Sequence, residues 1–76
     1  MGVVLNTFRE ILKNARIKAG LTQKQMAMRL ETSERAYQHY EAGTREPNMT
    51  NLIALADTLD VSLDYLTGRS DDPARR

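Results

Sequence analysis

Residues 22–41 contain two short segments that each begin with a helix-capping residue and that are separated by a turn of about three residues. Thr22 is followed three positions later by Gln25, which is the capping-box pattern of a helix start. Ser33 is a suitable N-cap for a second helix, and Gly43 a suitable stop for it. Two short helices joined so tightly form a helix-turn-helix, and the rest of the chain must fold around that unit.

A first helix is predicted over residues 8–19. Thr7 and Glu10 form a capping box, apolar side chains then recur at spacings of three and four, and Gly20 supplies the stop. Strand signals are nearly absent outside the helical segments, where Val3-Val4 is the one β-branched pair. The chain is therefore expected to be all-α.

Two more helices are predicted after the helix-turn-helix. Asn48 is a suitable N-cap for a fourth helix, and Ser62 for a fifth that ends before Gly68. We therefore predict one compact five-helix domain over residues 1–68. Residues 69–76 carry no large apolar side chain to bury, so we expect them to form a disordered tail.

Composition narrows the classes of protein further. A chain of 76 residues holds one hydrophobic core, and its marginal burial favours association with a second copy. The sequence has no cysteine, which excludes a disulfide framework and a thiolate metal site. No apolar run approaches the roughly 18 residues of a membrane span. We expect a cytoplasmic protein that forms a homodimer and has no membrane partner.

Charge is only permissive evidence for a nucleic-acid partner. The net charge is +1, from 11 basic and 10 acidic residues, whereas many nucleic-acid-binding domains are strongly basic. Residues 1–50 carry a net +3 and residues 51–76 a net −2. Chance alone could produce so small an imbalance.

The third predicted helix has two different faces. At about 100° per residue, Tyr37, Tyr40 and Glu41 fall on one side, where the tyrosine rings can be buried. The other side carries Glu34, Arg35, Gln38 and His39. Arginine and glutamine side chains can pair with guanine and adenine edges in the major groove, so Arg35 and Gln38 are the leading candidates for reading bases. The alternative is an ordinary solvated helix face.

Groups that could bind phosphate lie on both sides of this helix in the sequence. Gln23 and Lys24 begin the preceding helix, whose free N-terminal amides can also bind an anion. Thr44 and Arg45 stand in the loop that follows. The pattern indicates that a DNA backbone could be held on either side of the bases.

Several segments of the chain resemble one known family. They are Leu21-Thr-Gln23, Tyr40-Glu-Ala-Gly43, Arg45-Glu-Pro47 and Val61-Ser-Leu-Asp-Tyr-Leu-Thr-Gly68. With the apolar positions between them, these segments are similar to the Cro and phage-repressor (Xre-type) helix-turn-helix family over about residues 8–68. The resemblance implies a lambda-repressor-like DNA-binding domain that binds a two-fold operator in double-stranded DNA as a dimer. Such a protein regulates transcription, usually as a repressor, in a prokaryote or phage, and associates with the nucleoid.

The same resemblance implies roles for individual positions. Gln23 matches a glutamine that touches a backbone phosphate. The positions that generally face DNA are matched here by Ser33, Glu34, Arg35, Gln38 and His39. Arg16 and Glu41 match a pair that joins the first helix to the end of the third and orients it. The alternative for that pair is two unrelated surface charges.

Three positions depart from the family pattern. Glu31 stands where the first turn residue is often glycine, and it would be strained in a left-handed conformation. Tyr37 replaces the usual aliphatic residue and needs a partner for its hydroxyl. Glu34 would be repelled by phosphates unless it accepts a hydrogen bond from cytosine or braces Arg35.

Two other classes of function are less well supported. An enzyme would need a nucleophile with a base, but Ser33 and His39 point about 240° apart around their helix. A protein-binding module on the same fold, of antitoxin or anti-repressor type, is favoured slightly by Glu34 and the low net charge. We therefore expect no catalytic residue, no metal site, no cofactor and no small-molecule substrate.

The contact surface of the expected dimer is not defined by the sequence. Ile17, the segment Val3-Val4-Leu5, and Leu63 with Leu66 are candidates, although each could instead complete the core of the monomer. In a dimer the two third helices should lie about 34 Å apart, one turn of DNA.

Overall fold

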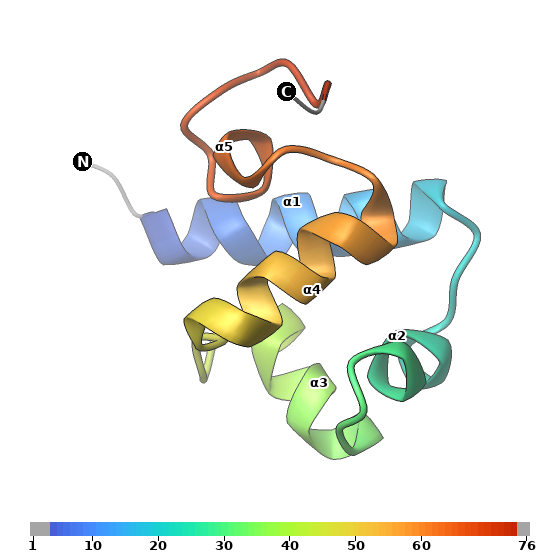
Figure 1. The fold of residues 1–76 in the computed structure, drawn as a ribbon. Helices are drawn as coiled ribbons and strands as arrows, with labels where there is room; N and C mark the ends of the chain where they lie inside the picture. Colours follow the sequence, from blue (N-terminus) through green and yellow to red (C-terminus); the bar gives the residue numbers. More distant parts are fainter. Residues whose placement is uncertain (1–3, 75–76) are drawn as a thin grey trace.

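The structure, a computed structural model, describes residues 4–74, with side chains from residue 8 onward. Its five helices are α1 (Val4–Lys18), α2 (Gln23–Arg29), α3 (Glu34–Ala42), α4 (Met49–Leu59) and α5 (Leu63–Leu66) (Figure 1). Residues 4–74 contain no β-strand, so the predicted all-α class is confirmed. Within the same range no helix is long and apolar enough to cross a membrane.

The predicted N-caps of α2 to α5 are confirmed. In each helix the cap side chain accepts a hydrogen bond from the backbone N–H three residues later; the caps are Thr22, Ser33, Asn48 and Ser62. Thr22 also completes the predicted capping box, because its own N–H donates to Gln25 Oε1 at 2.8 Å. Each cap stabilises its helix by about 1 kcal/mol, so these helix starts are specified locally.

The predicted start of α1 is wrong. We expected the helix to begin at residue 8 with Thr7 as its N-cap, but it begins at Val4 and Thr7 lies inside it. No glycine or proline interrupts residues 4–7, and extending an existing helix gains a backbone hydrogen bond per residue. The other end is close to the prediction, since α1 ends at Lys18 and Gly20, two residues later, is left-handed with φ 76°.

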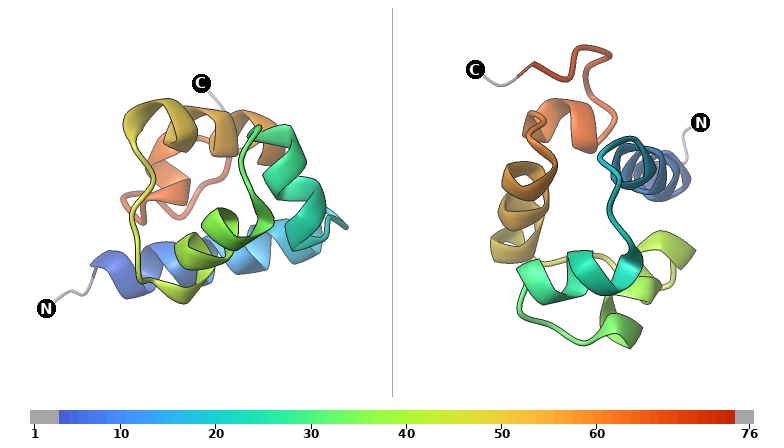
Figure 2. Two further views of the ribbon diagram at one scale, coloured as in Figure 1. Left: turned by 90° about the horizontal axis from the view of Figure 1, so that it is seen from below. Right: turned by 90° about the vertical axis from the view of Figure 1, so that its right-hand side faces the viewer.

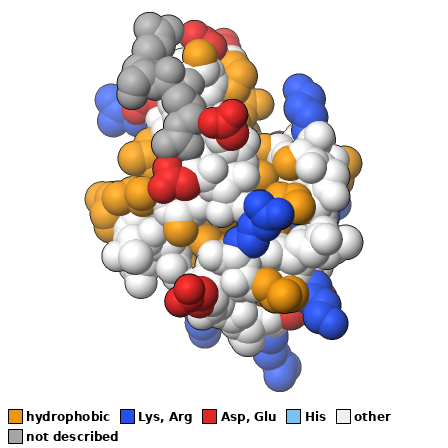
Figure 3. Space-filling view, turned by 45° about the vertical axis from the view of Figure 1, so that its right-hand side comes forward, with side chains coloured by type: hydrophobic (Ala, Val, Ile, Leu, Met, Phe, Trp, Pro, Cys, Tyr) orange, Lys and Arg blue, Asp and Glu red, His pale blue; other side chains and the backbone are white. Residues whose placement is uncertain are grey.

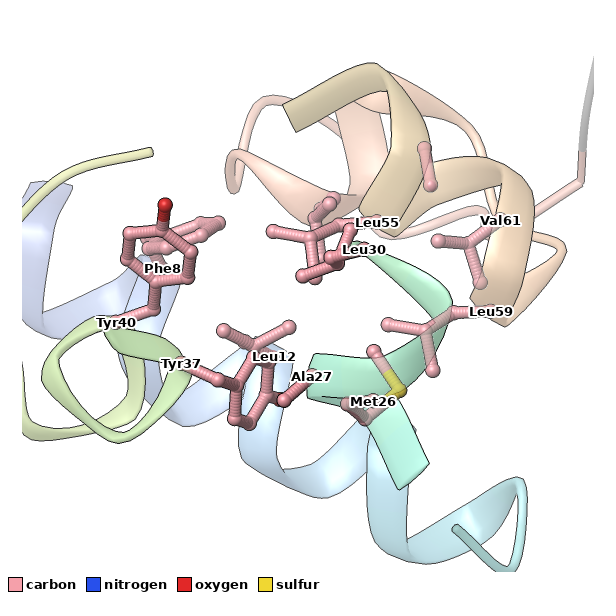
Figure 4. Packing of buried hydrophobic residues seen from close by; sticks show 12 residues of the cluster. Phe8, Leu12, Met26, Ala27, Leu30, Tyr37, Tyr40, Leu55, Leu59 and Val61 are labelled. Atoms are coloured by element: carbon pink, nitrogen blue, oxygen red, sulfur yellow. The ribbon is translucent and has the colours of Figure 1, made fainter. Parts of the chain in front are cut away.

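All five helices contribute to one hydrophobic core. The largest fully buried side chains are Leu12, Met26, Tyr37, Leu55 and Leu66. Figure 4 shows the buried side chains of α1 to α4 converging on this cluster. Met26 and Ala27 of α2 are buried, as is Leu30, the C-cap of the same helix. Leu66, which the sequence left open as either core or dimer contact, belongs to the core.

The third helix, α3, lies at one end of the molecule. Figures 1 and 2 show α2 and α3 together at that end, with α5 and residues 69–74 on the opposite side. Residues 69–74 turn back past the start of α5, where Pro73 O accepts the N–H of Ser62 at 3.0 Å. Disorder of the tail over residues 69–76 stays a prediction.

Candidate nucleic-acid interface

The turn between α2 and α3 is built around Glu31. Its φ is 57°, in the left-handed region. The next residue, Thr32, donates its N–H to Ala27 O at 3.0 Å and so closes the end of α2. A side chain in this region costs about 1 kcal/mol or more. The left-handed turn is therefore kept although a glutamate stands where glycine would fit without strain.

Two tyrosines anchor the inner face of α3. Tyr37 is fully buried, and its hydroxyl donates to Glu41 Oε2 at 2.5 Å, which supplies the partner that the phenol needed. The Tyr40 hydroxyl accepts a hydrogen bond from Asn51 Nδ2 of α4 at 3.0 Å. The two rings meet edge to face, with centroids 6.1 Å apart. This face of α3 is thus fixed both to the core and to α4.

The carboxylate of Glu41 joins three helices. Arg16 of α1 donates to it through Nε, at 2.6 Å from Oε2, and through Nη2, at 3.2 Å from Oε1. Gln23 of α2 donates its Nε2 to Oε1 at 3.0 Å. The remaining Arg16 nitrogen, Nη1, donates to Leu21 O at 2.9 Å, just before α2. We call Arg16, Gln23, Tyr37 and Glu41 the Glu41 cluster.

The Glu41 cluster fixes the charge of its own members. Burial alone would raise the pKa of the Glu41 carboxyl, but hydrogen bonds from Arg16, Tyr37 and Gln23 outweigh burial and hold this pKa below its usual range. Burial, followed by the hydrogen bond to Glu41, raises the pKa of the Tyr37 hydroxyl far above its ordinary value. The hydrogen bond to Glu41 likewise raises the pKa of Arg16. At neutral pH the cluster therefore holds one carboxylate, one guanidinium cation and one neutral phenol.

The outer face of α3 is open to solvent. The exposed side chains at its start and along it are Ser33, Glu34, Arg35 and Gln38. Ser33 Oγ already accepts one hydrogen bond, from the N–H of Ala36 at 3.0 Å. His39 is half-buried, and its Nδ1 lies 2.8 Å from Thr44 Oγ1. Four of the residues expected to face DNA therefore share one accessible surface, and His39 lies at its edge against Thr44.

The residues expected to bind phosphate flank this surface. Lys24 in the first turn of α2 is exposed, as are Thr44 and Arg45 after α3. Gln23 is half-buried, and one N–H of its amide is donated to Glu41. The sequence did not indicate the hydrogen bond from Gln23 to Glu41, because the two residues are 18 positions apart.

Arg9 contacts α3 in a way that the sequence analysis missed. Its Nη1 donates to Ala42 O, the last carbonyl of α3, at 3.3 Å. A signal was present in the sequence, since Arg9 stands seven residues before Arg16 and so falls on the same face of α1. Two arginines of α1 therefore reach the end of α3.

Charged side chains of both signs are spread over the molecule. Figure 3 shows several Lys and Arg side chains projecting from the lower end, where α2 and α3 lie, and acidic side chains at both the upper and the lower end. The +3 and −2 division of the sequence therefore does not form separate basic and acidic surfaces on this face. Across the described residues, no group of three or more histidine, aspartate or glutamate side chains is arranged to hold a metal ion.

The chain matches the model of a known protein family. The model of the helix-turn-helix family matches residues 12–66, most of the chain. The chain belongs to the Cro/phage-repressor (Xre-type) helix-turn-helix family. Members of this family are DNA-binding transcriptional regulators and not enzymes, which agrees with the expectation from the sequence.

Relatives in the helix-turn-helix family carry names of the same kind. The uncharacterized HTH-type transcriptional regulator YqaE of Bacillus subtilis is 49% identical over 59 residues, which are 78% of this chain and 51% of that protein. The CTXphi transcriptional repressor RstR of Vibrio cholerae is 43% identical over 61 residues, or 80% and 54% of the two chains. The HTH-type regulator ImmR of Bacillus subtilis is 40% identical over 60 residues, or 79% and 47%. The chain thus spans about half the length of the curated relatives it matches.

Proposed function

We propose that this helix-turn-helix domain binds double-stranded DNA at specific sequences, with α3 in the major groove, and represses transcription. The observation that carries the proposal is the division of α3 into two faces. The inner face is fixed by the Glu41 cluster and by Tyr40, while Arg35 and Gln38 stand exposed on the outer face. A rigidly held helix with exposed hydrogen-bonding side chains is what base readout requires.

The exposed residues divide into base-reading and phosphate-binding groups in this proposal. Arg35 and Gln38 pair with guanine and adenine, and Glu34 accepts a hydrogen bond from cytosine. Ser33 and His39 make further contacts with the DNA from the same surface. The phosphate-binding groups are Gln23, Lys24, Thr44 and Arg45. Arg16 and Glu41 act through the orientation of α3 and do not touch DNA.

A homodimer on a two-fold operator completes the proposal. Ile17 and Leu63 are 56% and 38% exposed, so both remain candidates for the contact between protomers. Of the third candidate, Val3 lies outside the described residues, whereas Val4 and Leu5 form the first turn of α1. Matched half-sites would lie about 34 Å apart. A protein bound to such operators would be cytoplasmic and associated with the nucleoid.

A second candidate function is a protein-binding module. It is favoured by Glu34, which is exposed in the first turn of α3, where a carboxylate weakens binding to phosphates unless it reads a cytosine. The net charge of +1 also imposes little attraction to DNA.

Electrophoretic shifts of a generic DNA duplex over a series of salt concentrations separate the two functions. Each phosphate contact makes log affinity fall with log salt by about 0.9. The DNA-binding proposal predicts a negative slope, to which the cationic side chains of Lys24 and Arg45 each contribute about one unit. A flat response would contradict it and favour a protein partner.

A further inference from the structure

We infer that Arg9 is a positioning residue for the loop of residues 43–45, and through it for the phosphate contact of Arg45. Arg9 holds the end of α3 from outside, so that the chain leaves the helix in one direction. The inference rests on the proposed function, because it takes Arg45 to bind a DNA phosphate.

The hydrogen bond from Arg9 meets α3 where a cation stabilises a helix. Ala42 is the last residue of α3, and its carbonyl has no partner within the helix. Arg9 Nη1 donates to this oxygen at 3.3 Å. The C-terminal end of a helix also carries a partial negative charge, which attracts the guanidinium. Arg9 therefore binds the backbone of α3, while Arg16, about two turns further along the same face of α1, binds the carboxylate of Glu41.

Gly43 makes room for the Arg9 side chain. A Cβ atom at Gly43 would lie 2.9 Å from Arg9 Cδ, closer than such atoms approach in proteins. The φ of Gly43 is 78°, so glycine also suits the backbone at this position. Arg9 Nε is buried and has no hydrogen-bond partner among the described residues. The stem of Arg9 is thus held by packing over Gly43, and its head by Ala42.

The other side of the loop is tied to α3 itself. The N–H of Thr44 donates to His39 O at 3.1 Å, and Thr44 Oγ1 lies 2.8 Å from His39 Nδ1. With Arg9 on one side and His39 on the other, the path of the backbone from Gly43 onward is constrained. Arg45 follows Thr44 directly and is exposed, so the position of its side chain depends on that path.

A double-mutant cycle in the salt dependence of DNA affinity tests this role. Arg9→Met keeps an unbranched stem over Gly43 but removes the guanidinium, and Arg45→Ala removes the phosphate contact. We expect Arg9→Met to lower the salt slope by about one unit, as Arg45→Ala does, and to weaken binding several-fold. In the Arg45→Ala background, Arg9→Met should then change the slope no further, because both changes remove the same contact.

Matched controls separate positioning from other roles. Lys13→Met removes an exposed cation from the same helix and should leave the slope unchanged. Arg9→Lys keeps a charged donor and should restore part of the lost slope. Urea unfolding of each variant gives the folded fraction, so that affinities refer to folded protein only.

Three results would overturn the inference. Slopes that add in the double variant would mean that Arg9 binds phosphate itself. Equal slopes for Arg9→Met and Lys13→Met would mean that Arg9 supports only the fold. If the wild-type chain shows no salt-dependent affinity for DNA, the proposed function fails as well, whereas in the first two cases it stands.

Discussion

Arg16 of α1 and Glu41 of α3 form a two-point ion pair across 25 positions of the sequence, with Nε to Oε2 at 2.6 Å and Nη2 to Oε1 at 3.2 Å. The two side chains are only 13% and 5% exposed. Tyr37 and Gln23 donate to the same carboxylate, so few of its hydrogen-bonding positions are left unfilled. The orientation of α3 therefore depends on side chains from two other helices.

Arg16→Met should lower the free energy of unfolding by about 3 kcal/mol. The substitution keeps most of the apolar stem but leaves the buried Glu41 carboxylate without its cation. Urea denaturation at pH 7 measures the loss. Lys18→Met, which removes an exposed cation two residues further along α1, is the matched control and should cost little. A loss below about 1 kcal/mol for Arg16→Met, as for an exposed ion pair, would contradict this account.

The Glu41 cluster should make the protein sensitive to acid. The pKa of Glu41 is lower in the folded state than in the unfolded chain, where a glutamate titrates at about 4.3. The carboxylate therefore stabilises the fold above that pH, and the stabilisation is lost as the pH falls through the folded-state pKa. Urea denaturation across an acid pH series should show a smaller decline in Glu41→Gln than in wild type.

The control for the acid series is Glu46→Gln, which changes an exposed carboxylate in the loop before α4. This variant should follow the wild-type decline. A parallel loss of unfolding free energy in Glu41→Gln and wild type down to low pH would contradict a stabilising role of the Glu41 carboxylate.

Glu31→Gly should stabilise the protein by about 1 kcal/mol. The φ of 57° at Glu31 is strained for any side chain, and glycine adopts it freely. Glu31→Ala keeps the strain while removing the same charge, so it separates the backbone effect from electrostatics. Thermal or urea denaturation of the three proteins gives the comparison. Equal stability of the alanine and glycine variants would show that the turn stores no such strain.

Arg35→Ala and Arg45→Ala should weaken DNA binding in different ways. Loss of Arg35 should relax the preference for one base pair by about 1–3 kcal/mol, because a bidentate contact with a base is removed. Loss of Arg45 should weaken binding to all sequences alike and reduce the salt slope by about one unit. Affinities for an operator and its single-base variants at several salt concentrations separate the two. The reverse pattern would exchange the roles.

The features predicted from the sequence are those encoded by neighbouring residues. The caps at Ser33 and Asn48 and the two faces of α3 follow from spacing within one helix, and all were found. Thr7 shows the limit of such signals. A capping box permits a helix to start, but nothing stops the preceding residues from extending it, as residues 4–6 do.

Contacts between distant residues could not be predicted from spacing. The pairing of Arg16 with Glu41 was expected only through resemblance to a family. The bond from Gln23 to Glu41 and the bond from Arg9 to Ala42 join residues 18 and 33 positions apart. Such bonds depend on how whole helices pack, and the local pattern carries no information about that packing. The buried position of Leu66 was open for the same reason.

Selection of bound sites from a pool of random DNA duplexes is the most direct test of the claim that the outer face of α3 reads DNA sequence. We expect enrichment of two-fold symmetric sites whose half-sites lie about 10 base pairs apart, centre to centre. In the same selection, Arg35→Ala should lose the preference at one position in each half-site. No enriched sequence, or an enriched sequence that is identical for wild type and Arg35→Ala, would contradict the claim.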